Sequence, residues 1–217
     1  MIIENGINSY TSTLLNTNEY FLTMVSRLHN FDGSYTIPTD VYYVEYVDPD
    51  VAQMSAPLIT KAEVMNYTDA RIAVNNFNSR ARSGNHAIAA NPVVAFPVEP
   101  VPALQHYRLV HESPTNAFAS SQVTGVDIKY VKTFEYVKGA RIKGDGFIEV
   151  SVVSNTGRNF TYEQQSVNGE FIVPYSTSGN PYDVKTITSY HIIGTDTGKQ
   201  YEVTEDAVMQ GLVVNAR

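Results

Sequence analysis

Short segments with the character of β-strands recur at regular spacing through the C-terminal part of this sequence, and this recurrence constrains the fold most. Aromatic and β-branched residues fill the segments, and turns rich in glycine and asparagine separate them. The clearest turn is Val167-Asn168-Gly169-Glu170, because both of its central residues tolerate a positive φ. The pattern predicts a β-sandwich or barrel. We expect its strands at 128–137, 147–153, 159–165, 170–174, 185–193, 199–204 and 211–215.

The part of the chain before these segments mixes helical and extended patterns. Thr60 and Glu63 match a capping box, and after them apolar residues recur at helical spacing from Ala70 to Ala81. Tyrosine and valine dominate the stretch up to Val47, which indicates a strand. The expected elements are a helix at 20–28, a strand at 41–47, a helix that follows Thr60 and ends near Gly84, a short strand at 86–90, an ordered loop at 91–103 and an extended segment at 104–113.

Together these patterns predict an α+β protein with two domains. Residues 1–125 are expected to form a small mixed α/β part, and residues 126–217 an all-β sandwich or barrel domain. The boundary is placed in the polar stretch SPTNAFASSQVTGV, residues 113–126. We therefore expect residues from about 126 to 215 to fold independently.

Composition excludes several classes of function. The net charge of −7 argues against a nucleic-acid partner, because phosphate binding needs a basic surface. The absence of cysteine excludes disulfides, thiolate nucleophiles and cysteine-based metal sites. The N-terminal MIIENGINSY lacks the features of a signal peptide, and no uninterrupted apolar run reaches the length of a membrane span. We expect the chain as given to be soluble.

The histidines do not form a metal motif. His106 and His111 lie five positions apart in an expected strand, so their side chains point to opposite faces. A zinc site needs ligands that converge on one point. The other histidines lie in separate expected elements: His29, His86 and His191.

Other catalytic patterns are also missing from the sequence. It contains no G-x-S-x-G, no G-x-G-x-x-G after a strand and no Walker motif. Asp48, Asp50 and Asp145 lie beside proline or glycine, and we interpret them as turn residues. Two N-glycosylation sequons begin at Asn66 and Asn159, and their modification stays open.

Two short motifs combine basic and acidic residues. Arg27 and His29 lie at the end of the expected first helix, where basic groups complement the negative end of the helix dipole. Arg108, His111 and Glu112 lie on the extended segment at 104–113. From their chemistry we interpret these charges as structural.

Four stretches of the sequence, in this order, resemble one protein family. They are TMVSRLHNFDGS (23–34), LQHYRLVHESPT (104–115), VKTFEYVKGARIKG (131–144) and NTGRNFTYEQQSVNGEFIVPYST (155–177). They are similar to the C-terminal soluble region of archaeal oligosaccharyltransferase catalytic subunits of the long AglB type, which are dolichyl-linked glycan transferases. The resemblance covers most of residues 20–215. Four motifs in the right order are specific, although each one alone is modest.

The sequence departs from that family where the family carries its chemistry. The membrane helices of those subunits, and the acidic metal-binding loops among them, have no counterpart in this chain. The Trp-Trp-Asp-Tyr-Gly signature that reads the acceptor needs tryptophan, and the chain has none. The resemblance therefore assigns no catalytic, cofactor-binding or metal-binding residue here. It implies that Met1 is an artificial or internal start.

The resemblance implies a non-catalytic, extracytoplasmic C-terminal portion of a membrane oligosaccharyltransferase. The parent would transfer a lipid-linked glycan to asparagine in Asn-X-Ser/Thr sequons, with a Mn²⁺ or Mg²⁺ ion bound elsewhere. Residues 1–125 would be the end of its central core, and residues 126–217 its peripheral domain. The implied partners are the upstream transmembrane part of the same polypeptide, which would anchor the chain at the membrane, the acceptor polypeptide and the lipid-linked oligosaccharide.

The same resemblance places the two charged motifs at the seam between core and β domain. These residues are Arg27, His29, Arg108, His111 and Glu112. An alternative hypothesis is a stand-alone β-sandwich module that binds carbohydrate or protein, with exposed tyrosines as stacking surfaces.

Overall fold

The structure is a computed structural model that describes residues 2–4, 10–12, 18–90, 96–117, 128–194 and 199–216. Most of the polar stretch at 113–126, including the predicted boundary after residue 125, lies outside these residues. The chain divides into two compact units at other positions. Unit 1 comprises Met1–Glu19 and Ile37–Pro100, and unit 2 comprises Tyr20–Thr36 and Val101–Arg217. Unit 2 is therefore discontinuous in sequence, and residues 37–100 are inserted into it.

The two ends of the insertion meet inside unit 2. The amide of Thr36 donates to the carbonyl of Val101 over 3.0 Å, and the amide of Val101 donates back over 3.2 Å. The two residues form an antiparallel bridge. The division thus differs from the predicted boundary, because 20–36 and 101–125 belong to the same unit as the C-terminal strands.

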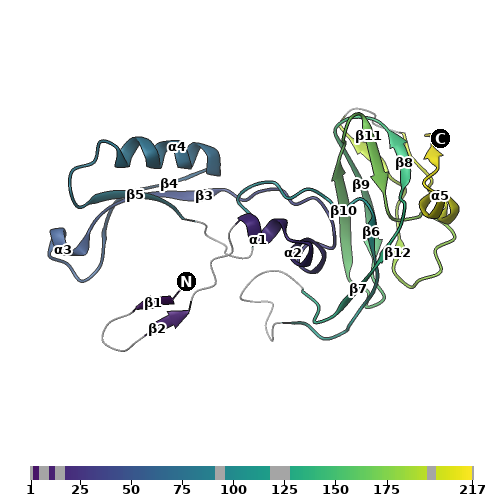
Figure 1. Cartoon of the computed structure of the whole chain (residues 1–217), viewed down its shortest axis with the longest axis horizontal. Coiled ribbons are helices and arrows are strands. Elements are labelled where there is room, and N and C mark those ends of the chain that lie inside the picture. The colour runs from purple at the N-terminus through teal and green to yellow at the C-terminus, as the bar shows by residue number, and fades with distance from the viewer. Residues whose placement is uncertain are drawn as a thin grey trace. The chain divides into compact units, whose positions relative to one another are not determined.

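Unit 1 is a small α+β structure. A three-stranded antiparallel sheet has the order β4-β3-β5, and helix α4 packs against β3 and β5 on one face (Figure 1). Its elements are β1 (Ile2–Glu4), β2 (Tyr10–Ser12), β3 (Val41–Val47), α3 (Pro49–Ala52), β4 (Leu58–Met65), α4 (Tyr67–Asn78) and β5 (Asn85–Ala90). Helix α1 (Asn18–Leu22) spans the division between the units.

The strand prediction for 41–47 is confirmed, whereas the capping box at Thr60 is wrong. Thr60 and Glu63 lie within β4, which pairs with β3 on both sides of a register shift at Thr60. The helix begins later, where the side chain of Asn66 accepts from the amide of Asp69 over 2.9 Å. Strand pairing therefore overrides the local capping pattern at Thr60. The N-cap of the helix is Asn66, three residues before Asp69.

Unit 2 is mainly β structure with short helices. Its elements are α2 (Met24–His29), β6 (Tyr107–Glu112), β7 (Lys132–Tyr136), β8 (Ala140–Lys143), β9 (Phe147–Val153), β10 (Asn159–Gln165), β11 (Glu170–Val173), β12 (Lys185–Thr186), β13 (His191–Ile193), α5 (Glu205–Gln210) and β14 (Val213–Val214). The expected helix at 20–28 is two helices, because α1 ends at Leu22 and Thr23 caps α2. The prediction of an α+β chain is confirmed, but the C-terminal part is not all-β because it contains α5.

Three sheets of unit 2 share one core. One sheet has the order β10-β9-β12 with β13 also paired to β9, the second has the order β11-β8-β14, and the third pairs β6 with β7. Every second residue of β9 is fully buried, which is the alternation expected of a strand with one face inward. The core residues include Ile142, Ile148, Val150, Val152, Tyr162, Phe171, Tyr190 and Val208.

The predicted turn at Val167–Glu170 is confirmed. Asn168 and Gly169 have φ of 55° and 75°, and Val167 and Glu170 exchange two backbone hydrogen bonds. The turn joins strands of different sheets, since β10 pairs with β9 and β11 pairs with β8. Among the helices described, none is long and apolar enough to cross a membrane.

Candidate functional site

Four charged side chains form a largely buried ion-pair cluster around Arg158 in unit 2. The guanidinium of Arg158 donates to Asp32 through two hydrogen bonds of 2.8 and 2.9 Å. It also donates to Glu112, with 2.6 Å between Nη2 and Oε2. Lys132 completes the cluster with 2.7 Å between its Nζ and Oδ1 of Asp32. We call Asp32, Glu112, Lys132 and Arg158 the Arg158 cluster.

Local backbone geometry positions each member of this cluster. Asp32 has a φ of 55°, which is rare outside glycine but tolerated by aspartate, and Gly33 follows with 75°. The next residues attach this turn to the edge of β10, because Ser34 accepts from the amide of Glu163 over 2.8 Å. Arg158 ends the turn between β9 and β10, where Gly157 has a φ of 82°. The FDGS and NTGR motifs thus meet through their charged residues.

Glu112 is fully buried, yet it is held in its charged form. Burial alone would raise its pKa, but hydrogen bonds from Arg158, Ser154 and Thr156 outweigh burial and lower the pKa to about 2. Ser154 and Thr156 each donate to Oε1 over 2.6 Å. A carboxylate with this many donors is a poor base, so the arrangement favours a structural role over proton transfer.

A second buried charge lies at Arg108, which is 1% exposed. Its guanidinium donates to Glu205 with bonds of 2.8 and 2.6 Å and to Glu135 with bonds of 2.9 and 2.7 Å. Burial would lower its pKa, but the two carboxylates raise the pKa above the ordinary arginine value. Arg108 therefore joins strand β6 to strand β7 and to helix α5.

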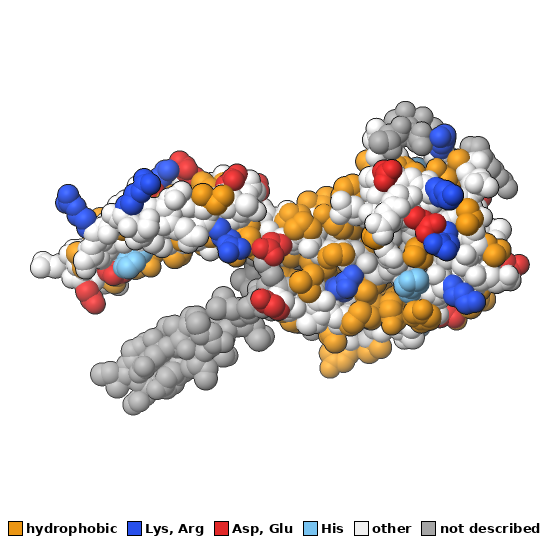
Figure 2. Space-filling model, turned by 45° about the horizontal axis from the view of Figure 1, so that its top comes forward, with side chains coloured by type: hydrophobic (Ala, Val, Ile, Leu, Met, Phe, Trp, Pro, Cys, Tyr) orange, Lys and Arg blue, Asp and Glu red, His pale blue; other side chains and the backbone are white. Residues whose placement is uncertain are grey.

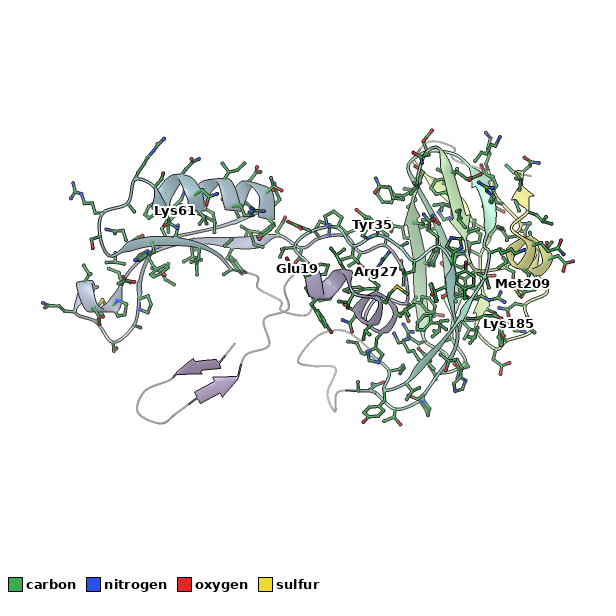
Figure 3. The ribbon with its side chains drawn as sticks, in the orientation of Figure 1. Glu19, Arg27, Tyr35, Lys61, Lys185 and Met209 are labelled. Carbon is green, nitrogen blue, oxygen red and sulfur yellow. The ribbon has the colours of Figure 1, made fainter. Side chains whose placement is uncertain are left out.

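The other predicted seam residues differ in their surroundings. Arg27 donates to the carbonyls of Pro102 and Ala103 over 2.7 and 2.9 Å, which ties α2 to the segment before β6 (Figure 3). The backbone carbonyl of His29, not its ring, accepts from Lys132 over 2.9 Å. The side chain of His111 is exposed. All of these residues lie within unit 2.

Sequence reasoning missed several partners in these clusters. Asp32 and Arg158 both occur in stretches that carry the family resemblance, so that resemblance was the signal for them. Glu135 also occurs in such a stretch, whereas Glu205 follows it and carried no local pattern. Pairing across such long sequence separations is set by the sheet topology, which a single sequence does not reveal.

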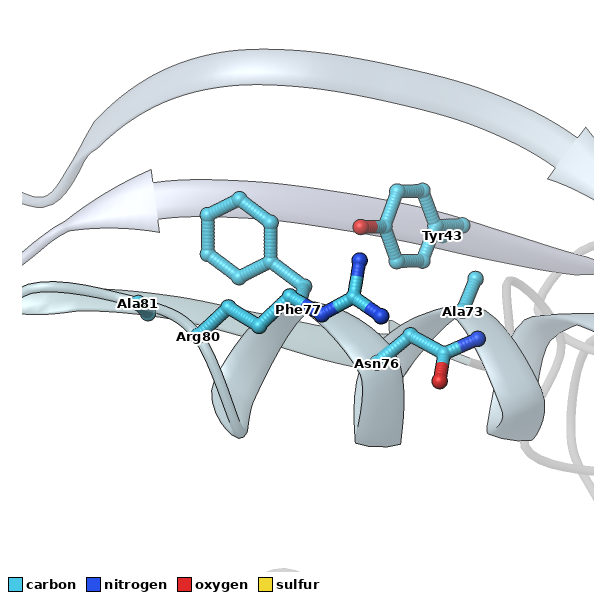
Figure 4. Close-up of a pocket in the computed structure, with 6 residues that line it drawn as sticks. All are labelled: Tyr43, Ala73, Asn76, Phe77, Arg80 and Ala81. Carbon is cyan, nitrogen blue, oxygen red and sulfur yellow. The ribbon is translucent and has the colours of Figure 1, made fainter.

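In unit 1, an open groove of about 350 Å³ lies beside helix α4. Figure 4 shows side chains of α4 and the residues after it facing Tyr43 on β3. The hydroxyl of Tyr43 donates to Glu45 over 2.8 Å, and burial together with this bond raises the pKa of Tyr43 to about 12. The groove is lined by Tyr43, Ala73, Asn76, Phe77, Arg80 and Ala81. This lining includes no carboxylate or histidine, so it offers no acid–base pair.

The remaining titratable residues do not gather into a metal centre in the described part of the chain, where no group of three candidate ligands occurs. His86 pairs with Asp48 over 3.0 Å, and His191 pairs with Glu149 over 2.9 Å. On the face seen in Figure 2, acidic and basic side chains are interspersed, unlike the continuous basic surface that nucleic acid requires.

The two sequons lie on regular elements rather than in loops. Asn66 caps α4, and its amide nitrogen donates to Asp69 over 2.6 Å. Asn159 is the exposed first residue of β10.

Comparison with known families gives a match over the C-terminal part. Residues 139–214 match the family described as archaeal glycosylation protein B long peripheral domain. The matched segment runs from Gly139, before β8, through β14. It therefore contains Arg158 and Glu205 but neither Asp32 nor Arg108.

Two relatives extend the similarity along the chain. The glycotransferase AglB of Haloferax volcanii is 33% identical over 168 residues, which are 56% of this chain and 16% of that protein. Dolichyl-phosphooligosaccharide-protein glycotransferase 3 of Archaeoglobus fulgidus is 27% identical over 208 residues, 90% of this chain and 22% of that protein. An Archaeoglobus fulgidus AglB structure with an inhibitory peptide and a dolichol-phosphate aligns with a TM-score of 0.44, 17% identity, and coverage of 82% of this chain and 26% of that chain.

The chain thus spans roughly a fifth of the length of these relatives. The match over residues 139–214 contains the fourth of the four resembling stretches, 155–177, and the end of the third, 131–144. Residues 139–214 thus match the archaeal glycosylation protein B long peripheral domain family, and the chain as a whole is similar to part of archaeal AglB glycotransferases.

Proposed function

We propose that this chain is a non-catalytic C-terminal portion of an oligosaccharyltransferase that transfers a lipid-linked glycan to asparagine in Asn-X-Ser/Thr sequons. The observation that carries the proposal is the match of residues 139–214 to a peripheral domain of glycosylation protein B. The similarity to two archaeal glycotransferases supports it over a longer part of the chain.

In this proposal unit 2 supports the enzyme mechanically. Its strongest polar interactions are ion pairs that join distant segments, and each buried carboxylate is occupied by arginine, lysine or hydroxyl donors. Such groups are committed to the fold and are not available to bind a glycan or an acceptor. Catalysis would belong to residues outside this chain.

The proposal extends to partners and location. The upstream transmembrane part of the same polypeptide would anchor the chain on the extracytoplasmic face of the membrane. The acceptor polypeptide and the lipid-linked oligosaccharide would bind the whole enzyme. A Mn²⁺ or Mg²⁺ ion would be bound elsewhere in the parent, because the described residues of this chain offer no cluster of three ligands for it.

A chimera tests this proposal. In the Archaeoglobus fulgidus glycotransferase 3, whose alignment covers 90% of this chain, the aligned region is replaced by residues 20–217, and glycan transfer to an acceptor peptide is measured in membranes. We expect the deletion to abolish transfer and the chimera to restore a measurable part of it. The isolated chain should transfer nothing. A chimera that is expressed and folded but remains as inactive as the deletion would contradict the proposal.

A further inference from the structure

Strand β4 leaves one sheet edge of unit 1 open. In the order β4-β3-β5 it is an outer strand, and within the described residues the outer edge of β4 has no backbone hydrogen-bond partner. The strand is eight residues long and exposed over nearly its whole length. Such an edge is a template for a further strand.

The side chains of β4 are apolar as well as exposed. Leu58, Ile59 and Val64 are 44%, 63% and 62% exposed, although β-branched and leucine side chains gain from burial. Helix α4 packs on β3 and β5, so it leaves β4 uncovered. A long outer strand with exposed apolar side chains indicates that something else pairs with it.

The charges on β4 specify what that partner is. Lys61 and Glu63 lie two residues apart, so they share one face of the strand, and their side chains are 3.1 Å apart. Lysine alone on an outer strand discourages pairing. Here Glu63, two residues away, offsets the effect of Lys61 on pairing. If a second β4 runs antiparallel to the first, each lysine can face a glutamate.

We propose that two copies of this chain associate through antiparallel pairing of their β4 strands, centred on Ala62. In this register Ala62 lies opposite Ala62 of the second copy, and Lys61 lies opposite Glu63 on both sides of the two-fold axis. Opposite charges at directly facing positions favour pairing, and like charges oppose it. The result is a continuous six-stranded sheet across the two copies.

Neighbouring registers are disfavoured by the same charges. Centring the pair on Lys61 would place two lysines opposite each other, and centring it on Glu63 would place two glutamates together. A symmetric antiparallel pair must be centred on a residue, because two facing residues direct their backbone groups either both toward each other or both away from each other. The sequence around Ala62 therefore selects one register among these three.

Charge reversal tests the proposal in the full chain. Sedimentation across a concentration series should show dimers of the wild type, and Lys61→Glu should raise the dimer Kd by roughly tenfold or more. The double variant Lys61→Glu with Glu63→Lys should restore dimerisation, because it exchanges the charges and keeps them complementary. Lys185→Glu is the matched control, since Lys185 is an exposed lysine on β12 of unit 2, and it should leave the Kd unchanged (Figure 3).

Cross-linking tests the register itself. The chain has no cysteine, so Ala62→Cys introduces a single thiol that should form a disulfide-linked dimer under mild oxidation. Val64→Cys should not, because in this register its own counterpart is about 14 Å away along the strand. A wild-type chain that stays monomeric at every concentration would overturn the proposal. So would a Lys61→Glu variant that dimerises like wild type, or equal cross-linking by the two cysteine variants.

Discussion

Arg158 and Asp32 lie 126 positions apart in the sequence, yet two hydrogen bonds of 2.8 and 2.9 Å join their side chains. This pair attaches the segment before the inserted unit to the turn between β9 and β10. Because Arg158 also holds the fully buried Glu112, the removal of one side chain leaves two carboxylates without their main cation.

Arg158→Met should therefore destabilise unit 2 strongly. Removing one partner of a buried ion pair costs about 3–5 kcal/mol, because the remaining charge is left unpaired away from water. The measurement is the free energy of unfolding from denaturant titration. Arg80→Met is the control, since Arg80 is exposed in unit 1, and it should change the value by less than about 0.5 kcal/mol. A loss below about 1 kcal/mol for Arg158→Met would show that the cluster contributes little.

The stability of unit 2 should fall in acid through Glu112. Its pKa is about 2 in the folded chain against an ordinary value of 4.5, so its contribution is fully present above about pH 5 and is lost as the pH falls toward 2. Glu112→Gln should be less stable at neutral pH and should show a shallower loss of stability between these pH values. Equal pH dependence in the two proteins would mean that Glu112 is not the titrating group.

Unit 2 should fold without the inserted residues. Thr36 and Val101 already exchange two backbone hydrogen bonds, so replacing 37–100 by Asn-Gly closes the chain with a short hairpin turn. We expect the shortened protein to melt cooperatively with β-type circular dichroism. Residues 126–217 alone should not, because they lack β6, Asp32 and Glu112. Cooperative melting of residues 126–217 alone, together with an unfolded shortened protein, would instead support the boundary expected from the sequence.

Alanine substitutions at two glycines with positive φ should distinguish the cost of backbone strain from the cost of steric crowding. Gly157 has a φ of 82° and open space around it, so Gly157→Ala should cost about 1–2 kcal/mol from backbone conformation alone. Gly139 has a φ of 75°, and an added Cβ would lie 2.5 Å from Cγ2 of Ile172 and 3.2 Å from the carbonyl of Gln105. Gly139→Ala should therefore cost at least about 1 kcal/mol more. Equal losses of unfolding free energy would show that the neighbours of Gly139 give way.

The sequence predicted best the elements that have a strong local pattern. Strands at 147–153 and 159–165 were predicted with their observed bounds, because alternating burial and glycine turns mark both. Helix α5 was missed, since six residues are too few to show helical periodicity. It is stabilised instead by the side chain of Thr204, which caps it, and by the burial of Val208.

The partners of the charged residues, like helix α5, have no local pattern in the sequence from which they could be predicted. Arg27, Arg108 and Glu112 were identified as structural charges from their positions at a helix end and on an extended segment. Their partners could not be named, because Arg108 meets Glu205 only through the packing of α5 against β8 and the path of β6. Strand β8 was not among the expected strands, because only four residues separate Gly139 from Gly144.

The most direct test of the central claim is Arg108→Ala in the chimera of this chain with the Archaeoglobus fulgidus glycotransferase 3. We expect the free energy of unfolding to fall by about 1.5–3 kcal/mol, because a buried charge-assisted network is lost, while the acceptor KM stays unchanged. Activity would then decline only with the amount of folded protein. Unchanged stability together with a many-fold rise in acceptor KM would contradict the account and place Arg108 in the acceptor site.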